Sequence, residues 1–136
     1  MNSVFVFIAL LGLSFGLPGG KVELSKDQIK GLLSENGAFS TGLNVAIGKL
    51  NDGNGEFRTV RDEVLGATSQ VVAGILYEVD IKVVESVCAN LEINASMMTT
   101  NECPAKNKSE AKTCKVTILS RPWFETADSL IVNIAC

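Results

Sequence analysis

The sequence contains no histidine, and this absence removes most of the catalytic chemistry open to a small protein. Serine and cysteine nucleophiles are usually activated by an imidazole, and histidine is a common zinc ligand, so these types of site cannot be built here. A pair of carboxylates remains, but no spacing distinguishes one pair among Asp62, Glu63, Glu78 and Asp80. We therefore expect no enzyme activity, no metal and no cofactor.

The four cysteines all lie in the C-terminal part of the chain, at Cys88, Cys103, Cys114 and Cys136. They form no C-x-x-C motif, and an even number of cysteines in a secreted protein indicates two disulfides. Four cysteines allow three pairings. We favour sequential pairing, because it closes two short local loops and fixes the last residue of the chain. A free catalytic thiol is then not expected.

The first segment of the chain has the properties of a secretory leader. Residues 1–16 carry no charged side chain and include an apolar run that suits a signal peptide and is too short to span a bilayer. Cleavage after Gly16 leaves residues 17–136, which we expect to form one secreted domain without a membrane anchor. The net charge of −3 argues against nucleic acid as a partner.

Three further segments carry residues that are unusual for a plain scaffold. The first is an apolar turn between two strand-like runs, where Asn, Asp, Gly or Pro would be ordinary. It comprises Gln70, Val71, Val72, Ala73 and Gly74. The second is Pro122-Trp123, which holds the only tryptophan, and the third is Leu17-Pro18-Gly19-Gly20. Alternatively, the valines continue a strand into the core, the tryptophan folds back on the sheet, and the terminus is a simple tail.

The segment between the leader and the strands is expected to be helical. Ser25 and Gln28 fit a capping box, and the turn cluster Asn51–Gly55 ends the helix. Between them, apolar residues recur near a period of 3.6. This stripe consists of Ile29, Leu32, Leu33, Phe39, Leu43, Ala46, Ile47 and Leu50. Glycines weaken the helix, which leaves room for a break near Asn36-Gly37.

Beyond Glu56 the hydrophobic pattern changes to a period of two, which is typical of strands with one buried face. The alternation is clearest in Tyr77, Val79, Ile81 and Val83. Other strands are expected over residues 57–69, 113–119 and 130–136. The polar segment 90–111 is expected to be a surface excursion, with possible glycosylation at Asn94 and Asn107. The sequence thus predicts an α+β fold, in which one long N-terminal helix packs across a 4–5-stranded antiparallel sheet.

Considered together, the three unusual segments resemble the binding elements of the secreted (type 2) cystatins, which inhibit papain-like cysteine proteases. In that family a Q-x-V-x-G hairpin loop, a P-W hairpin loop and an N-terminal glycine form a wedge. Here they correspond to Gln70–Gly74, to Pro122-Trp123, and to Gly19 or Gly20. The cysteine order and the leader also fit, and the family implies sequential disulfides too. The resemblance implies reversible, tight-binding inhibition of cathepsin-class proteases by a secreted protein, which we expect to be a monomer. A domain-swapped dimer is the alternative, because a strained loop joins two long strands.

The chemistry that the resemblance implies is blockage of the protease cleft without a reaction. The side chains of Val71, Val72 and Ala73 would bury apolar surface in the cleft. Gln70 and Gly74 would permit the tight turn and the close approach of the backbone. Trp123 would be a rigid anchor, and Gly19 would let the terminus cross the catalytic centre.

The sequence departs from the family pattern at two places, and a second function is compatible with the fold. Between Gly19 and the helical segment Leu43-Asn44-Val45-Ala46, the chain has several more residues than the family usually has, which makes Gly31 a second candidate for the N-terminal glycine. Asn54 lies where some members carry an S-N-D segment against legumain-type proteases. Because the Ser and Asp are missing, we interpret it as part of a helix-ending turn. The alternative function is a non-inhibitory cystatin-fold module, either cathelin-like or immunomodulatory.

Overall fold

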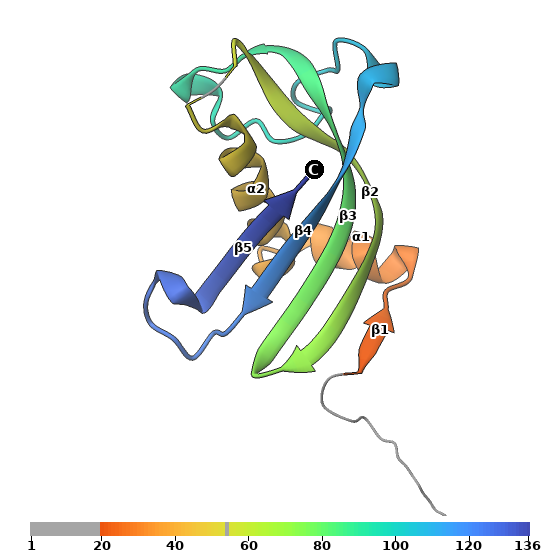
Figure 1. Ribbon diagram of the computed structural model, residues 1–136, viewed down its shortest axis with the longest axis vertical. Helices are drawn as coiled ribbons and strands as arrows, with labels where there is room; N and C mark the ends of the chain where they lie inside the picture. The colour runs from red at the N-terminus through yellow and green to blue at the C-terminus, as the bar shows by residue number, and fades with distance from the viewer. Residues whose placement is uncertain (1–19, 54) are drawn as a thin grey trace, which may run out of the picture.

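A computed structural model describes residues 20–53 and 55–136, so the leader, Gly19 and Asn54 lie outside the described part. Two helices cover one face of a five-stranded antiparallel sheet (Figure 1). The elements in chain order are β1 (Lys21–Glu23), α1 (Lys26–Ser34), α2 (Ala38–Asn51), β2 (Phe57–Val72), β3 (Gly74–Ala89), β4 (Lys112–Ser120) and β5 (Leu130–Ala135). Neighbours in the chain are also neighbours in the sheet. The expected α+β class is confirmed.

The expected single long helix is in fact two helices. The capping box at the start of α1 is formed, since the Ser25 hydroxyl accepts from the Gln28 backbone amide while the Gln28 side chain accepts from the Ser25 amide. Helix α1 ends at Ser34, and Gly37 is the extended N-cap residue of α2. The break therefore lies where the sequence is richest in residues that disfavour helix, at Asn36-Gly37. No helix within the described residues is long and apolar enough to cross a membrane.

The main core lies between the helices and the sheet. Helix α2 contributes Phe39, Leu43, Ala46 and Ile47, all buried as their helical spacing predicts. The facing strands contribute Val79, Ile81, Val83, Val116, Ile118 and Val132. Helix α2 approaches β4 closely at Gly42, where an added Cβ would lie 2.6 Å from the Cδ1 atom of Ile118. Glycine is needed at this point because the space is already filled by a buried side chain.

The segment between β3 and β4 packs against the upper part of the sheet as a small second core. Val60, Val84 and Cys103 form its buried centre. The disulfides pair Cys88 with Cys103 and Cys114 with Cys136, so the sequential pairing is confirmed. The excursion is also held by Arg58, a residue that the sequence did not single out. This buried guanidinium donates to the carbonyl oxygens of Met97 and Ala95 and to the Asn90 side chain.

Candidate functional site

The apolar turn forms the tip of a long hairpin. Strand β2 pairs with β3 as far as Val72 opposite Gly74, which leaves Ala73 alone at the tip. Val71 is 62% exposed and Val72 is 38% exposed. The valines do continue the strand, as one interpretation of the sequence held, but they do not enter the core. A row of exposed apolar side chains therefore ends the hairpin, and exposed Ile75 extends it on β3.

The tryptophan lies on the next hairpin loop, between β4 and β5. Trp123 is 60% exposed, so it does not fold back onto the sheet. Phe124 is next to it, with the two ring centroids 6.4 Å apart. The Arg121 guanidinium lies 4.3 Å from the Phe124 ring and also donates to the Asp128 carbonyl oxygen. The loop is thus an exposed aromatic pair fixed by one arginine, and the sequence had indicated only the tryptophan.

The two loops meet at Gly74. Ile75 at the start of β3 lies opposite Ser120 at the end of β4, so the hairpin tip and the tryptophan loop are neighbours at the same end of the molecule (Figure 1). Gly74 has a φ of 124°, a backbone conformation that residues with a side chain rarely adopt. A Cβ there would also fall on the Ser120 carbonyl oxygen and come within 3.0 Å of the Arg121 Cγ atom. The close backbone approach expected of Gly74 is made to this chain's own second loop.

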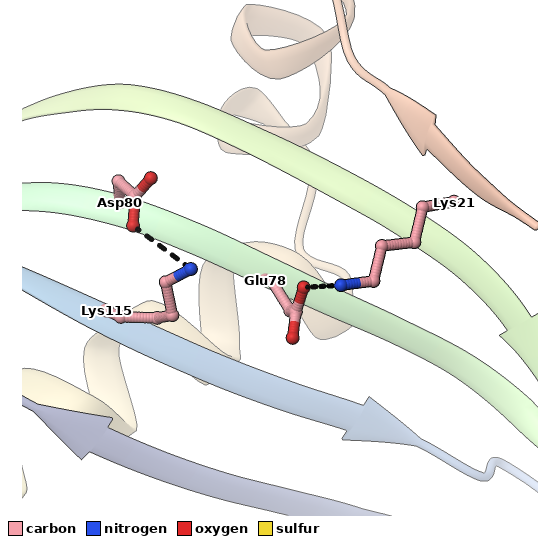
Figure 2. A network of polar contacts seen from close by, with 4 residues as sticks. All are labelled: Lys21, Glu78, Asp80 and Lys115. Carbon is pink, nitrogen blue, oxygen red and sulfur yellow. Dashed lines mark hydrogen bonds and ion pairs between the residues drawn. The ribbon is translucent and has the colours of Figure 1, made fainter.

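The N-terminal segment reaches the same end of the sheet through β1. Lys21 lies opposite Gln70, so the exposed Gly20 comes next to the hairpin tip. The Lys21 ammonium reaches across β2 to the Glu78 carboxylate at 2.8 Å, on the face of the sheet away from the helices (Figure 2). The hydrogen bond from Lys21 is the largest cause that holds the pKa of Glu78 below its ordinary value of 4.5. Gly31, the second glycine candidate, lies instead within helix α1.

The geometry of this end suits binding rather than catalysis. Three segments far apart in the sequence present an apolar hairpin tip, an aromatic pair and an extended terminus in adjacent positions. We call the described part of this surface, Gly20, Gln70–Gly74 and Pro122–Phe124, the apical edge. Within the described residues no group of His, Cys, Asp and Glu could hold a metal, and no cysteine is free. The apical edge is thus an exposed, largely apolar surface built on and beside paired strands.

The two glycosylation candidates differ in their surroundings. The Asn94 side-chain amide donates to the Ala89 carbonyl oxygen at 2.7 Å, and the residue is half-buried. Asn107 is exposed, and its Oδ1 atom accepts from the Ser109 hydroxyl of the same sequon at 2.7 Å. Both lie on the excursion, away from the apical edge. Of the two asparagines, Asn107 is the one whose Nδ2 atom, to which a glycan would be attached, makes no hydrogen bond to another described residue.

Comparison with known proteins gives the family. A family model of the cystatin domain matches residues 35–123. The chain is 33% identical over 120 residues to the Caenorhabditis elegans protein Cystatin cpi-1, covering 87% of this chain and 79% of that protein. Together these findings show that the chain belongs to the cystatin family. Members of this family are inhibitors and not enzymes, so membership supports protease inhibition as the general function.

Solved structures agree on the fold. A salivary cystatin of the soft tick Ornithodoros moubata is similar with a TM-score of 0.62 and 25% identity, over 88% of this chain and 98% of that chain. Dimeric human cystatin F is similar with a TM-score of 0.56 and 16% identity, over 90% of each chain. At that identity the second likeness shows only that the fold is shared.

Proposed function

We propose that this protein is a secreted, reversible and tight-binding inhibitor of papain-like cysteine proteases of the cathepsin class. The apical edge would enter the active-site cleft, with the N-terminal glycine segment on one side, Gln70–Gly74 in the centre and Pro122-Trp123 on the other side. Gly19 would belong to the same segment as Gly20. The mature chain would act as a monomer, and its two disulfides suit an extracellular, oxidising setting.

The observation that carries this proposal is the exposure of apolar side chains on rigid backbone at the apical edge. Val71 and Trp123 would lose most of their exposed surface in a cleft, at about 25 cal/mol per Å² of apolar area. Val71 stands on a paired strand, and Trp123 stands on the adjoining loop, whose start is packed against Gly74. Little conformational freedom would therefore be lost on binding. A standard interface of about 1,600 Å² in total could then support nanomolar affinity.

Inhibition requires no bond to break in either protein. The hairpin tip would present Val72, Ala73 and Gly74 to the cleft. The two apolar side chains and the glycine bring no side-chain nucleophile or proton donor to the protease thiolate. The residues of the apical edge carry no charged side chain, so the surface that would enter the cleft is uncharged. The inhibitor would occupy the cleft by shape and apolar contact alone.

A non-inhibitory cystatin-fold module is the alternative function. It would not require apolar side chains to be exposed at the apical edge, whereas here the tip valines and Trp123 are solvent-accessible. This difference favours the inhibitor over the alternative.

The proposal is tested by adding increasing amounts of refolded, oxidised residues 17–136 to papain or cathepsin L of known active-site concentration and measuring the remaining protease activity. We expect loss of activity at a one-to-one ratio and full recovery of intact inhibitor by mass spectrometry. A correctly disulfide-bonded protein that fails to inhibit either protease would contradict the proposal and favour the non-inhibitory module.

A further inference from the structure

The outer edge of β2 has a gap between two segments that cover it. At one end, the Arg61 amide donates to the Met98 carbonyl oxygen, and the Thr100 amide donates to the Arg61 carbonyl oxygen. At the other end, the Leu24 amide donates to the Ala67 carbonyl oxygen, and β1 begins to pair at Thr68. Among the described residues, no strand pairs with this edge over residues 62–66. Register shifts within this stretch bend the edge, so it suits only a short partner segment.

A groove of about 420 Å³ lies at this gap, between α1 and β2. Its apolar lining includes Ile29 and Leu33 from α1 and Leu65 from β2, and Leu65 is 47% exposed. An exposed leucine beside an open strand edge is a feature that soluble proteins usually avoid. The groove is therefore able to accept an apolar side chain together with extended backbone.

Three cations line the same groove, namely Lys26 and Lys30 from α1 and Arg61 from β2. Within the part of the chain that the structure describes, none of them has an ion pair or a side-chain hydrogen bond, although the protein carries more acidic than basic residues. Burial lowers the pKa of Arg61 from its ordinary value, because the charged guanidinium loses contact with water. The one carboxylate in the lining, that of Glu63, pairs with Lys82 at 3.6 Å. A ligand that carries negative charge would therefore complement the three cations of this groove.

We propose that this groove, lined by Lys26, Lys30 and Arg61, binds a short extended peptide segment that carries acidic side chains next to apolar ones. A carboxylate of the peptide would accept two parallel hydrogen bonds from the Arg61 guanidinium, and the two lysines would add positive charge at the rim of the groove. The peptide backbone would bond to the open edge of β2, and an apolar side chain would contact Leu65. A sulfated glycan would leave the apolar lining unused, and a lipid would leave the strand edge unused.

The groove is separate from the apical edge. Val64 lies seven residues before Val71 along β2, which is roughly 23 Å of extended strand. A bound peptide would therefore leave the hairpin tip free, and the protein could hold a protease and an acidic segment at the same time. This inference does not depend on the proposed inhibition.

Fluorescence anisotropy with a labelled hexapeptide in which glutamate alternates with valine tests the proposal, using oxidised residues 17–136. We expect saturable binding that weakens with salt, and no binding of the peptide with glutamine in place of glutamate. Arg61→Gln should weaken binding roughly tenfold or more, because it removes a charge-assisted pair. Lys30→Gln should weaken it by about two- to fivefold, as expected for an exposed charge.

Lys112→Gln is the matched control, because it removes one exposed cation on β4. This variant should bind like the wild type. Amide shifts of the wild-type protein on peptide addition should centre on residues 62–66, a test that needs no variant. The proposal is wrong if the peptide does not bind at about 1 mM, if the glutamine peptide binds equally, or if Lys112→Gln matches Lys30→Gln. Binding to anionic phosphatidylserine vesicles without binding to the peptide would likewise overturn it.

Discussion

At the scale of single residues, the site depends on a few side chains whose exposure the sequence could not settle. The types and spacing of Gln70–Gly74 and Trp123 indicated contacts, but each also fitted a place in the core. Exposure is a tertiary property, and it required the paired strands to be placed first. Phe124 and Arg121 were not indicated at all, because an arginine stacked on a neighbouring ring has no sequence pattern of its own.

Trp123→Ala should weaken inhibition of papain by roughly 30- to 1,000-fold, which corresponds to the loss of about 2–4 kcal/mol at an aromatic anchor. The effect should lie mainly in the dissociation rate, measured by surface plasmon resonance. The melting temperature should not fall, because the ring is largely exposed. Ile93→Ala is the matched control, since Ile93 is 80% exposed on the excursion. If Ile93→Ala weakens binding as much as Trp123→Ala, the tryptophan is not an anchor.

Gly74→Ala should reduce both stability and inhibition. Its positive φ costs about 1–3 kcal/mol for a residue with a side chain, and the Cβ would push the Ser120 backbone away. Both loops of the apical edge would then shift together. Gly66→Ala is the control on the neighbouring strand β2, because a Cβ there meets nothing within 4 Å. Chemical denaturation and inhibition assays measure the two effects. Unchanged values for Gly74→Ala would mean that the two loops are not locked at this residue.

At the scale of elements, the fold was largely predictable because its signals are local and repeated. The helical stripe, the alternation in β3, the capping box at Ser25 and the end of the helix near Asn51 were all in the sequence. Strand β1 was not predicted separately, since three residues carry too little periodicity. The role of Arg58 was not predicted either, because its hydrogen-bond partners lie more than thirty residues away along the chain.

Gly42→Ala and Gly48→Ala should have opposite effects on stability, although both replace a glycine inside α2. Each gains about 1 kcal/mol from helix propensity. At Gly42 the new methyl group would overlap buried Ile118, and overpacking costs typically about 1–3 kcal/mol. Overlap should win there, so Gly42→Ala should unfold at lower denaturant concentration than the wild type. At Gly48 nothing lies within 4 Å, so that variant should unfold at higher concentration. Equal shifts of the two midpoints would contradict this packing of α2 on β4.

The contact between Lys21 and Glu78 should make the attachment of β1 depend on pH. The pKa of Glu78 is lowered in the folded protein, mainly by the Lys21 hydrogen bond, so its stabilising effect is present above the ordinary value of 4.5. It is lost as the pH falls through the lower folded value. The melting temperature of the wild type should therefore exceed that of Glu78→Gln above about pH 5, and the difference should shrink at more acidic pH.

Asp80→Asn is the matched control for this pH experiment. Asp80 pairs with Lys115 on the same face of the sheet, but at 3.9 Å and with both side chains about half exposed (Figure 2). Exposed pairs of this kind contribute little, so the control should melt like the wild type. A difference for Glu78→Gln that does not change between pH 7 and pH 3 would contradict the role of the Lys21 contact.

At the scale of the whole molecule, the fold separates three surfaces. The apical edge gathers at one end, the disulfide-braced excursion lies at the other, and the groove with Lys26, Lys30 and Arg61 opens on the β2 edge between them. The helix-then-strands pattern indicated that the two hairpin loops lie at one end, because each hairpin joins neighbours in the sheet. The gap in the β2 edge could not be predicted, since it depends on where β1 stops and where the excursion returns.

The central claim is that the three segments of the apical edge bind a cysteine protease together. Hydrogen exchange of oxidised residues 17–136, alone and in complex with papain, tests it most directly. We predict slowed exchange at the backbone around Lys21, at residues 70–76 and at residues 121–126, with no change over residues 90–111. Protection confined to the excursion, or protection of only one of the three segments, would contradict the claim.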